Sequence, residues 1–322
     1  MLYLSEKDIL KAAAPIDVVD EVEAAMVLYE KKDFFMPDRM HIDYSGNTLL
    51  LMPCFARHYL GTKLVTLFPK NAEKNVPVLY GLMILNSGET GEPLAVLNGS
   101  ALTALRTGAV GSVGIRHLTP NTVNTLGVVG AGIQGFSQAL TACSQRKFSS
   151  VFVFDTISER MASFCRKLST AFPKINVMQV KSVEHLLRES QVVITTTTSL
   201  KPVLPEKEKL LEGKCFIGIG SYKPDMREFP KSLFKLLKKM YIDTETAREE
   251  SGDLITPVGK KWIKREQIFT LGKLIVGQIK DEPGKNGTSL FKSVGMALFD
   301  IVVSEFIFRK AKQLGLGTEV EI

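Results

Sequence analysis

A glycine-rich turn between two apolar runs places the strongest constraint on the fold of this chain. Residues 126–129 (LGVV) form a short apolar run, and Gly130-Ala131-Gly132-Ile133-Gln134-Gly135 and a helix-compatible segment follow it. A second β-rich run at 151–154 (VFVF) ends at Asp155. The resulting order of strand, turn, helix and strand is that of a dinucleotide-binding unit.

Each glycine of this turn has a physical role in such a unit. Gly130 permits the tight turn, Gly132 lets the backbone approach a pyrophosphate, and Gly135 lets the helix pack closely on the strand. The free amides and the positive end of the helix, near Ile133 and Gln134, then face the phosphates. A glycine triplet also occurs in ordinary loops, so the flanking strands are what favour a cofactor site.

The acid at the end of the second strand indicates which cofactor is bound. Asp155 follows the last glycine by about the twenty residues expected for the acid that accepts hydrogen bonds from a ribose hydroxyl. A carboxylate there repels a ribose phosphate, so Asp155 and Thr156 predict NAD(H), with NADP(H) possible because Arg160 lies nearby in the sequence. A helix N-cap is the alternative role for Asp155.

Bulk properties are those of a globular protein. The chain has 322 residues, 45% of them apolar and 23% charged, which is enough for two domains with substantial cores. Residues 1–8 mix acids with bases and do not resemble a signal peptide. No uninterrupted apolar run reaches the roughly eighteen residues of a membrane span. We expect a cytoplasmic protein with no membrane partner.

Neither a metal site nor a nucleic-acid interface is favoured. The four cysteines and four histidines are scattered without metal-ligand spacing, and the cysteines are expected to be reduced and mostly buried. The net charge of +7 and the basic segment 231–239 (KSLFKLLKK) raise the question of nucleic acid. The apolar positions of that segment instead fit a helix lying on a core with its lysines in solvent.

The order of predicted elements indicates an α/β fold. Helices are expected at 16–31, 101–118, 157–172, 183–189 and 295–314. β-rich runs at 47–53, 61–69, 78–85 and 93–97 suggest a mixed or antiparallel sheet, and those at 175–180, 192–195, 214–219 and 239–243 alternate with helices. Such alternation predicts a Rossmann-type, doubly wound parallel sheet. The predicted nucleotide domain, 119–294, is inserted into a second, α+β domain made of 1–118 and 295–322.

Ligands of such sheets bind at the carboxyl ends of the strands. Thr195, Thr196 and Thr197 fall at one such end and could hydrogen-bond a ribose or nicotinamide. Gly220, Ser221 and Tyr222 fall at another, where Gly220 would allow the backbone to approach a ring. The alternative is that these residues reflect only β-propensity and turn chemistry.

Seven stretches together resemble a known family. They are 36–39 (MPDR), 62–66 (TKLVT), 104–109 (ALRTGA), the glycine-rich turn, 218–228 (GIGSYKPDMRE), 250–253 (ESGD) and 291–297 (FKSVGMA). In this order they make the chain similar to the ornithine cyclodeaminase/mu-crystallin family over essentially its whole length. That resemblance implies a homodimer, with the first domain serving both substrate binding and dimerisation.

The resemblance also implies a substrate site. Arg39, Lys63 and Arg106 would surround the carboxylate of an amino or imino acid, with Lys63 as the catalytic residue and Arg106 also next to the cofactor. By the same resemblance, Ser293 would contact the cofactor and Val294 would contact the substrate. The chemistry agrees, because arginine presents a planar fork to a carboxylate and lysine is a mobile charge that can donate a proton.

One departure from the family pattern separates its branches. Members that cyclise ornithine carry an Asp just after the glycine-rich strand end, where this chain has Tyr222. A phenol with an ordinary pKa near 10 is a poor carboxylate substitute as a base, so ornithine cyclodeaminase itself is disfavoured. The segment resembles the mu-crystallin-like branch, which reduces ketimines. Asp225 is an alternative acid, although it fits a helix start equally well.

The resemblance therefore implies an NAD(H)-dependent oxidoreductase that acts on the CH–N bond of a small amino or imino acid. Reduction of a cyclic ketimine such as pyrroline-2-carboxylate and oxidative deamination of an L-amino acid are the two expected activities. A deaminating cyclase and a non-enzymatic dinucleotide- or ligand-binding protein of the mu-crystallin kind are the alternatives. Mu-crystallin resembles an NADPH user, whereas Asp155 here favours NAD(H).

Overall fold

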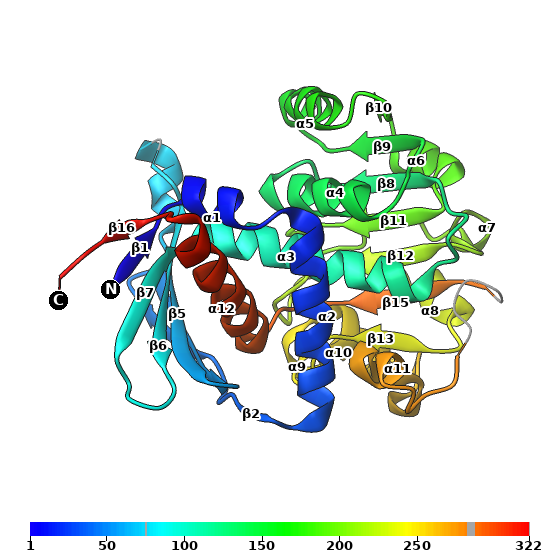
Figure 1. Ribbon diagram of the computed structural model, residues 1–322. Coiled ribbons are helices and arrows are strands. Elements are labelled where there is room, and N and C mark those ends of the chain that lie inside the picture. Colours follow the sequence, from blue (N-terminus) through cyan, green and yellow to red (C-terminus); the bar gives the residue numbers. More distant parts are fainter. Residues whose placement is uncertain (75, 282–286, 322) are drawn as a thin grey trace. The chain divides into compact units, whose positions relative to one another are not determined.

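The chain folds into two compact units in the computed structural model, which describes residues 1–74, 76–281 and 287–321. Unit 1 comprises Met1–Arg106 and Met296–Ile322, and unit 2 comprises Thr107–Gly295 (Figure 1). Unit 2 is thus inserted between two parts of unit 1. The first division falls inside helix α3 (Gly99–Leu118), whereas the sequence suggested a division at the end of that helix.

A largely antiparallel sheet forms the framework of unit 1. Its main strands are β4 (Asn47–Ala56), β5 (Tyr59–Leu67), β6 (Leu79–Ser87) and β7 (Pro93–Asn98), which are paired in chain order. Four short strands extend it, namely β1 (Leu2–Leu4), β2 (Phe34–Phe35), β3 (Met40–Tyr44) and β16 (Thr318–Glu319). Strand β1 runs parallel to β7, and the other pairs are antiparallel. Of the two arrangements expected from the sequence, mixed or antiparallel, the sheet is mixed.

Three helices accompany this sheet, and α12 covers one of its faces. Helix α1 (Glu6–Ala12) begins with a capping box between Ser5 and Asp8, and α2 (Pro15–Lys31) follows with proline at its first position. Helix α12 (Ala297–Leu314) packs against α2 and strands β4, β5 and β6 (Figure 1). A Cβ atom on Gly61 of β5 would collide with Ile301, which shows how closely α12 approaches the sheet.

Unit 2 contains the parallel sheet that the alternating pattern predicted. Its order is β10-β9-β8-β11-β12-β15-β13-β14, and every recorded pairing is parallel. The strands are β8 (Thr125–Val129), β9 (Ser150–Phe154), β10 (Asn176–Gln179), β11 (Val192–Thr195), β12 (Cys215–Gly218), β13 (Met240–Ile242), β14 (Ile268–Thr270) and β15 (Ser289–Lys292). The first five strands have the dinucleotide-fold order, with the switch between β8 and β11.

Helices cover both faces of the parallel sheet. On one face, Gly114 of α3 lies against Ile217 and Phe291, and α4 packs on β8 and β11. On the other, Leu186 of α6 lies against Gly127 and joins a core cluster with residues of α8. The helices after α3 are α4 (Ile133–Gln145), α5 (Ser158–Ala171), α6 (Val183–Glu189), α7 (Glu208–Leu211), α8 (Lys231–Leu236), α9 (Ala247–Glu250), α10 (Gly252–Gly259) and α11 (Leu271–Ile275); η1 (Pro69–Lys74) and η2 (Arg265–Gln267) are 3-10 helices.

The basic segment and the cysteines have the environments expected from the sequence. In α8, Leu233 and Phe234 are buried while Lys231 and Lys235 are exposed, so the lysines form a solvated face. The four cysteines are free thiols, and burial raises the pKa of Cys215 to about 12. Within the described ranges, none of the helices combines the length and hydrophobicity that crossing a bilayer requires.

Candidate active site

A buried cation on the central strand of unit 1 is paired with a buried acid on α12. Lys63 of β5 stands between Met52 and Met83 on the neighbouring strands and points to the covered face of the sheet. Its Nζ lies 2.8 Å from Oδ2 of Asp300, and both side chains are almost completely buried. A buried charge is costly unless it is paired, so Asp300 explains how Lys63 is tolerated there.

Arg106 binds the other oxygen of the same carboxylate. Its Nε donates to Oδ1 of Asp300 at 3.1 Å, so one acid holds two of the three predicted cations. This contact fixes the guanidinium plane, whose Nη groups provide the paired donors that suit a carboxylate. Arg39, half-buried between β2 and β3, is close enough to act electrostatically on Lys63. Unit 1 thus brings the three predicted substrate-binding cations into one charged cluster.

Burial changes the acidity of the lysine in this cluster. Loss of hydration lowers the pKa of Lys63 to about 8, and the positive charges of Arg106 and Arg39 act in the same direction. The negative charge of Asp300 opposes this effect. A lysine with a pKa near neutrality exchanges its proton far more readily than an ordinary lysine, which is the property that a general acid or base requires.

Asp300 was not singled out in the sequence, although a signal was present. It lies in the otherwise apolar stretch 297–303 (ALFDIVV), which forms the first turns of α12. An acid inside such a stretch is either exposed or paired, because an unpaired buried carboxylate is strongly destabilising. Only the fold shows that the partners are Lys63 and Arg106, which are far away in the sequence.

The glycine-rich turn of unit 2 has the local geometry expected of it. Gly130 has a φ of +103°, a conformation that favours glycine, and a Cβ on Gly135 would lie 1.9 Å from the carbonyl oxygen of Gly130. Gly132 is the N-cap of α4, and nothing lies within 4 Å of the position its Cβ would take. Ile133, the first residue of α4, is exposed. The turn is therefore tight on one side and open on the side where α4 begins.

Asp155 lies beside this turn, at the end of β9. Its Oδ2 accepts a hydrogen bond from the amide of Ala131 at 2.7 Å, and its Oδ1 accepts one from the amide of Ile157 at 2.9 Å. The carboxylate thus connects the ends of β8 and β9 and keeps further acceptor capacity on both oxygens. It does not cap α5, whose N-cap is Ile157 without a side-chain hydrogen bond. Thr156 is exposed next to it.

The threonines at the end of β11 are held by the protein itself. The Thr196 hydroxyl donates to the carbonyl of Gly130 at 2.9 Å, across the switch point of the sheet. The Thr195 and Thr197 hydroxyls each donate to Glu228 at 2.9 Å. Because these hydrogens are already used, the hydroxyl oxygens can still accept hydrogen bonds from a ligand but are not placed to donate them.

The residues after β12 divide into buried and exposed members. Ser221 is fully buried, and its hydroxyl donates to the carbonyl of Met226 at 2.7 Å. Tyr222 is 42% exposed, and Asp225 is exposed too. A Cβ on Gly220 would lie 2.1 Å from the carbonyl oxygen of Thr197, so the close approach here is to protein backbone.

Asp243 organises the loop that contains Ser293 and Val294. Its Oδ2 accepts from the hydroxyl of Ser293 at 2.6 Å and from the amides of Val294 and Gly295 at 3.0 and 2.7 Å. The fully buried Lys292, just before this loop, donates to the carbonyls of Gly218 and Ser293 at 3.2 Å each. Burial lowers the pKa of Lys292 below that of an ordinary lysine.

The residues present fit an NAD(H) site. Unit 2 offers the open N-terminus of α4 for phosphates, the Asp155 carboxylate for ribose hydroxyls, and threonine oxygens at the neighbouring strand end. A negative charge at the ribose end matches NAD(H), since a phosphate there would be repelled. Within the part of the chain that the structure describes, no group of His, Cys, Asp and Glu is arranged to hold a metal ion.

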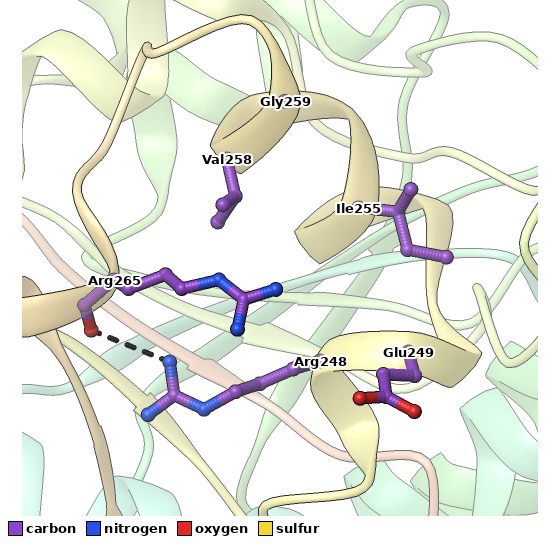
Figure 2. Close-up of a pocket in the computed structure, with 6 residues that line it drawn as sticks. All are labelled: Arg248, Glu249, Ile255, Val258, Gly259 and Arg265. Carbon is purple, nitrogen blue, oxygen red and sulfur yellow. Dashed lines mark hydrogen bonds between the residues drawn. The ribbon is translucent and has the colours of Figure 1, made fainter.

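A pocket of about 370 Å³ lies elsewhere in unit 2 and contains none of the predicted site residues (Figure 2). It is lined by Arg248, Glu249, Ile255, Val258, Gly259 and Arg265. The Arg248 guanidinium is occupied by protein groups, because it donates to the carbonyls of Arg265 and Ile268 at 3.3 and 2.7 Å and pairs with Glu245. The Arg248 side chain is therefore already used within the protein, whereas Glu249 and Arg265 also line the pocket.

Comparisons with known proteins show which family this chain resembles. The model of the ornithine cyclodeaminase/mu-crystallin family matches residues 2–315. A Delta(1)-pyrroline-2-carboxylate reductase of Bacillus cereus is 30% identical, with complete coverage of both chains.

Two solved structures of similar proteins contain a nicotinamide cofactor. One is Thermococcus litoralis Delta(1)-pyrroline-2-carboxylate reductase in complex with NADH and L-proline, with a TM-score of 0.92, 29% identity and coverage of 99% of this chain and 100% of the other. The second is an archaeal alanine dehydrogenase dimer with bound NAD, with a TM-score of 0.91, 27% identity and coverage of 100% and 99%. With a family model matching nearly its whole length, this chain belongs to the ornithine cyclodeaminase/mu-crystallin family.

Proposed function

We propose that this protein is an NADH-dependent reductase of a small cyclic imino acid, with pyrroline-2-carboxylate as the first substrate to test. The observation that carries the proposal is the buried cluster of Lys63, Arg106 and Asp300, which combines a proton donor with a carboxylate fork. Similarity to a pyrroline-2-carboxylate reductase over the complete length of both chains supports the same choice.

The residues of unit 1 have complementary roles in this proposal. Arg106 and Arg39 bind the substrate carboxylate, because guanidinium groups form paired, charge-assisted hydrogen bonds with it. Lys63 donates a proton to the imine nitrogen, which makes the neighbouring carbon more electrophilic and completes the new N–H bond. Asp300 orients both cations and, by opposing the effect of burial, keeps Lys63 mostly protonated near neutral pH. Val294, which belongs to unit 2, is proposed as a further substrate contact.

The residues of unit 2 hold the cofactor in this proposal. The backbone at Gly130, Gly132, Ile133, Gln134 and Gly135 binds the pyrophosphate, and Asp155 with Thr156 binds the adenosine ribose. The segments 195–197 and 220–222, with Ser293 and Arg106, are assigned to the nicotinamide half. When bound, NADH supplies the hydride that reduces the imine carbon, so that imine, hydride and proton together give the amine.

The decisive test measures NADH and NADPH oxidation at near-neutral pH with pyrroline-2-carboxylate and with piperideine-2-carboxylate. Rapid oxidation with either cyclic imine supports the proposal and identifies the preferred cofactor. If protein that binds NADH oxidises it with neither imine, the proposed substrate class is wrong.

A second candidate function is oxidative deamination of an L-amino acid. It is favoured by the similarity to the archaeal alanine dehydrogenase, and it uses the same carboxylate site and the same proton transfer. The reverse reaction, with pyruvate and ammonia in place of the cyclic imine, distinguishes the two. A cyclodeaminase remains less favoured because Tyr222 and Asp225 are exposed and no carboxylate replaces the missing Asp at position 222.

Non-enzymatic ligand storage is disfavoured by the unit 1 cluster. A buried set of two cations and one acid carries a net positive charge, which is costly without an anionic ligand. A storage protein needs that charge to bind a carboxylate, but it does not need a lysine whose pKa is brought to about 8. NADH oxidation with an imine separates the enzyme from a binding protein.

We further propose that the protein is a cytoplasmic homodimer that uses the open face of the unit 1 sheet. Strand register places Met40, Ile42, Tyr44, Tyr80 and Leu82 on one face, and each is 44% or more exposed. An apolar sheet face of this kind marks an interaction site, and a second copy is the simplest partner. The archaeal alanine dehydrogenase of similar structure is a dimer. Light scattering on the wild type and on Ile42→Lys tests the assignment, which a monomeric wild type would refute.

A further inference from the structure

Glu228 is a fully buried carboxylate that lies beneath the strand ends of unit 2. Its Oε1 accepts hydrogen bonds from the amide and the hydroxyl of Thr197, at 2.6 and 2.9 Å. Its Oε2 accepts from the hydroxyl of Thr195 at 2.9 Å and from the amides of Gly220 and Ser221 at 2.9 and 3.3 Å. One side chain thus receives five donors.

These donors come from two segments that are separate in the sequence. Thr195 is the last residue of β11 and Thr197 follows that strand, whereas Gly220 and Ser221 follow β12. The two strands are parallel neighbours, with Thr195 opposite Gly218, so their carboxyl ends lie side by side. Glu228 joins the two loops where they leave the sheet, the edge at which this fold binds ligands.

The chemistry of the contact requires a carboxylate. All five groups are donors, and an ionised carboxylate is acceptor-only with about four lone-pair directions. A glutamine has one oxygen, so its NH₂ group would face either the Thr197 amide or the Gly220 amide. Neither backbone amide can reverse its role, and an unmatched buried donor is costly. A glutamine at this position therefore forces at least one of the loops to move.

Glu228 is itself fixed by a second buried acid. Asp253 accepts the amide of Glu228 at 3.0 and 3.2 Å and the amide of Phe229 at 3.1 Å. The carbonyl of Glu228 accepts the amide of Val203 at 2.9 Å. The backbone amide and the backbone carbonyl of Glu228 are therefore both hydrogen-bonded within unit 2. These contacts fix the position from which the carboxylate extends.

We propose that Glu228 is a positioning residue, which sets the backbone of segments 195–197 and 220–221 for the nicotinamide half of the cofactor. Among the described residues, neither the glycine-rich turn nor Asp155, which would hold the ADP half, hydrogen-bonds to the Glu228 carboxylate. Loss of the carboxylate is therefore expected to act mainly on the nicotinamide half, and its effect on the ADP half would pass through the hydrogen bond from Thr196 to Gly130. This inference rests on the proposed function only in taking NADH as the cofactor.

The test compares two ligands on the complete protein, NADH and ADP-ribose, which lacks the nicotinamide ring. Binding of each is measured by calorimetry for the wild type, Glu228→Gln and Glu228→Asp. For Glu228→Gln we expect the Kd of NADH to rise roughly tenfold or more while the Kd of ADP-ribose stays within about twofold. Glu228→Asp keeps both acceptor oxygens on a shorter chain, so the Kd ratio should shift in the same direction but less.

Glu206→Gln is the matched control. The Glu206 carboxylate also accepts two backbone amides in unit 2, those of Lys231 and Ser232 at 3.0 and 2.9 Å, but it stands at the start of α8. This variant should leave the ratio of the two Kd values unchanged. Retained ADP-ribose binding also shows that a variant has folded, and Glu228→Asp carries the test if Glu228→Gln does not fold.

Two results would overturn the inference. Unchanged Kd values for both ligands in both Glu228 variants would mean that the carboxylate does not set the nicotinamide loops. Equal weakening of NADH and ADP-ribose would mean that Glu228 only stabilises unit 2. Failure of the proposed function is visible separately, because it would appear as a wild type that binds NADH and reduces neither imine.

Discussion

Lys63 and Asp300 form a buried ion pair in unit 1, with Nζ 2.8 Å from Oδ2. The pair joins the central strand of an antiparallel sheet to the helix that covers it. Asp300 keeps the cation in place, and burial keeps its pKa at about 8. A lysine in this state is charged at neutral pH and can still lose its proton during a reaction, which links the packing of α12 to the proposed chemistry.

The first prediction concerns the pH dependence of the two reaction directions. Imine reduction needs Lys63 protonated, so turnover should fall as pH rises through about 8, the pKa of this group. Oxidation of proline with NAD needs the neutral amine, so its rate should rise over the same range. Turnover at saturating substrate between pH 6 and 10, measured in both directions, checks the prediction.

Two variants separate Lys63 from other groups that titrate. Lys63→Met should abolish turnover at every pH while leaving the Kd of NADH within a few fold. Lys63→Arg should leave residual turnover without the change near pH 8, because a guanidinium does not lose its proton in this range. Persistence of that change in Lys63→Arg would assign it to another group, and full turnover by Lys63→Met would refute the catalytic role.

The second prediction concerns the acid of the pair. Asp300→Asn removes the negative charge that raises the pKa of Lys63, so the fall in reduction should move to lower pH by roughly one unit or more. It also leaves two buried cations without their acid, which should lower the free energy of unfolding by about 3–5 kcal/mol. The pH profile and urea unfolding provide the two measurements.

A surface ion pair provides the control for this stability effect. Glu208 pairs with Lys235 at 3.1 Å, and both side chains are at least half exposed. Glu208→Gln should change the free energy of unfolding by less than about 1 kcal/mol and leave the pH profile in place. If Asp300→Asn changed the free energy of unfolding as little as Glu208→Gln does, the Lys63–Asp300 pair would not stabilise unit 1 as proposed.

Much of the fold follows from local patterns in the sequence. The glycine-rich turn and the alternation of runs identified the parallel sheet, and the helices at 183–189 and 101–118 agree closely with α6 and α3. Strands β14 and β15 were not foreseen. They are short, and β15 lies between β12 and β13 in the sheet although it follows both in the chain. No local pattern encodes that order.

The candidate site was less visible in the sequence than the fold. The three cations were assigned through the resemblance to a family, and the glycines through the glycine-rich turn between two strands. The acids that hold these residues were not predicted. Asp300, Glu228 and Asp243 act through partners that only the fold brings close. The threonines show the same limit. Their position at the strand end was anticipated, but the use of their hydrogens by Glu228 and Gly130 was not.

The third prediction concerns cofactor choice. Asp155→Asn keeps an oxygen beside the glycine-rich turn but removes the charge that repels a ribose phosphate. The ratio of kcat/KM for NADH to that for NADPH should fall by roughly 10- to 100-fold, because a charge-assisted hydrogen bond to ribose is lost. Kinetics with both cofactors at fixed imine concentration give this ratio. A higher wild-type affinity for NADPH than for NADH would remove the basis of the assignment.

The fourth prediction separates the two purposes of the glycines in the turn. Gly135→Ala places a methyl group about where the Gly130 carbonyl oxygen lies, so α4 must move and the melting temperature should fall by several degrees. Gly132→Ala adds a methyl group in open space at an ordinary φ of −77°, so the melting temperature should change little. The same methyl group would stand where the pyrophosphate is expected, and NADH binding should weaken roughly tenfold or more. Calorimetric melting and NADH titration of both variants test this contrast. Unchanged NADH binding by a folded Gly132→Ala would place the phosphates elsewhere.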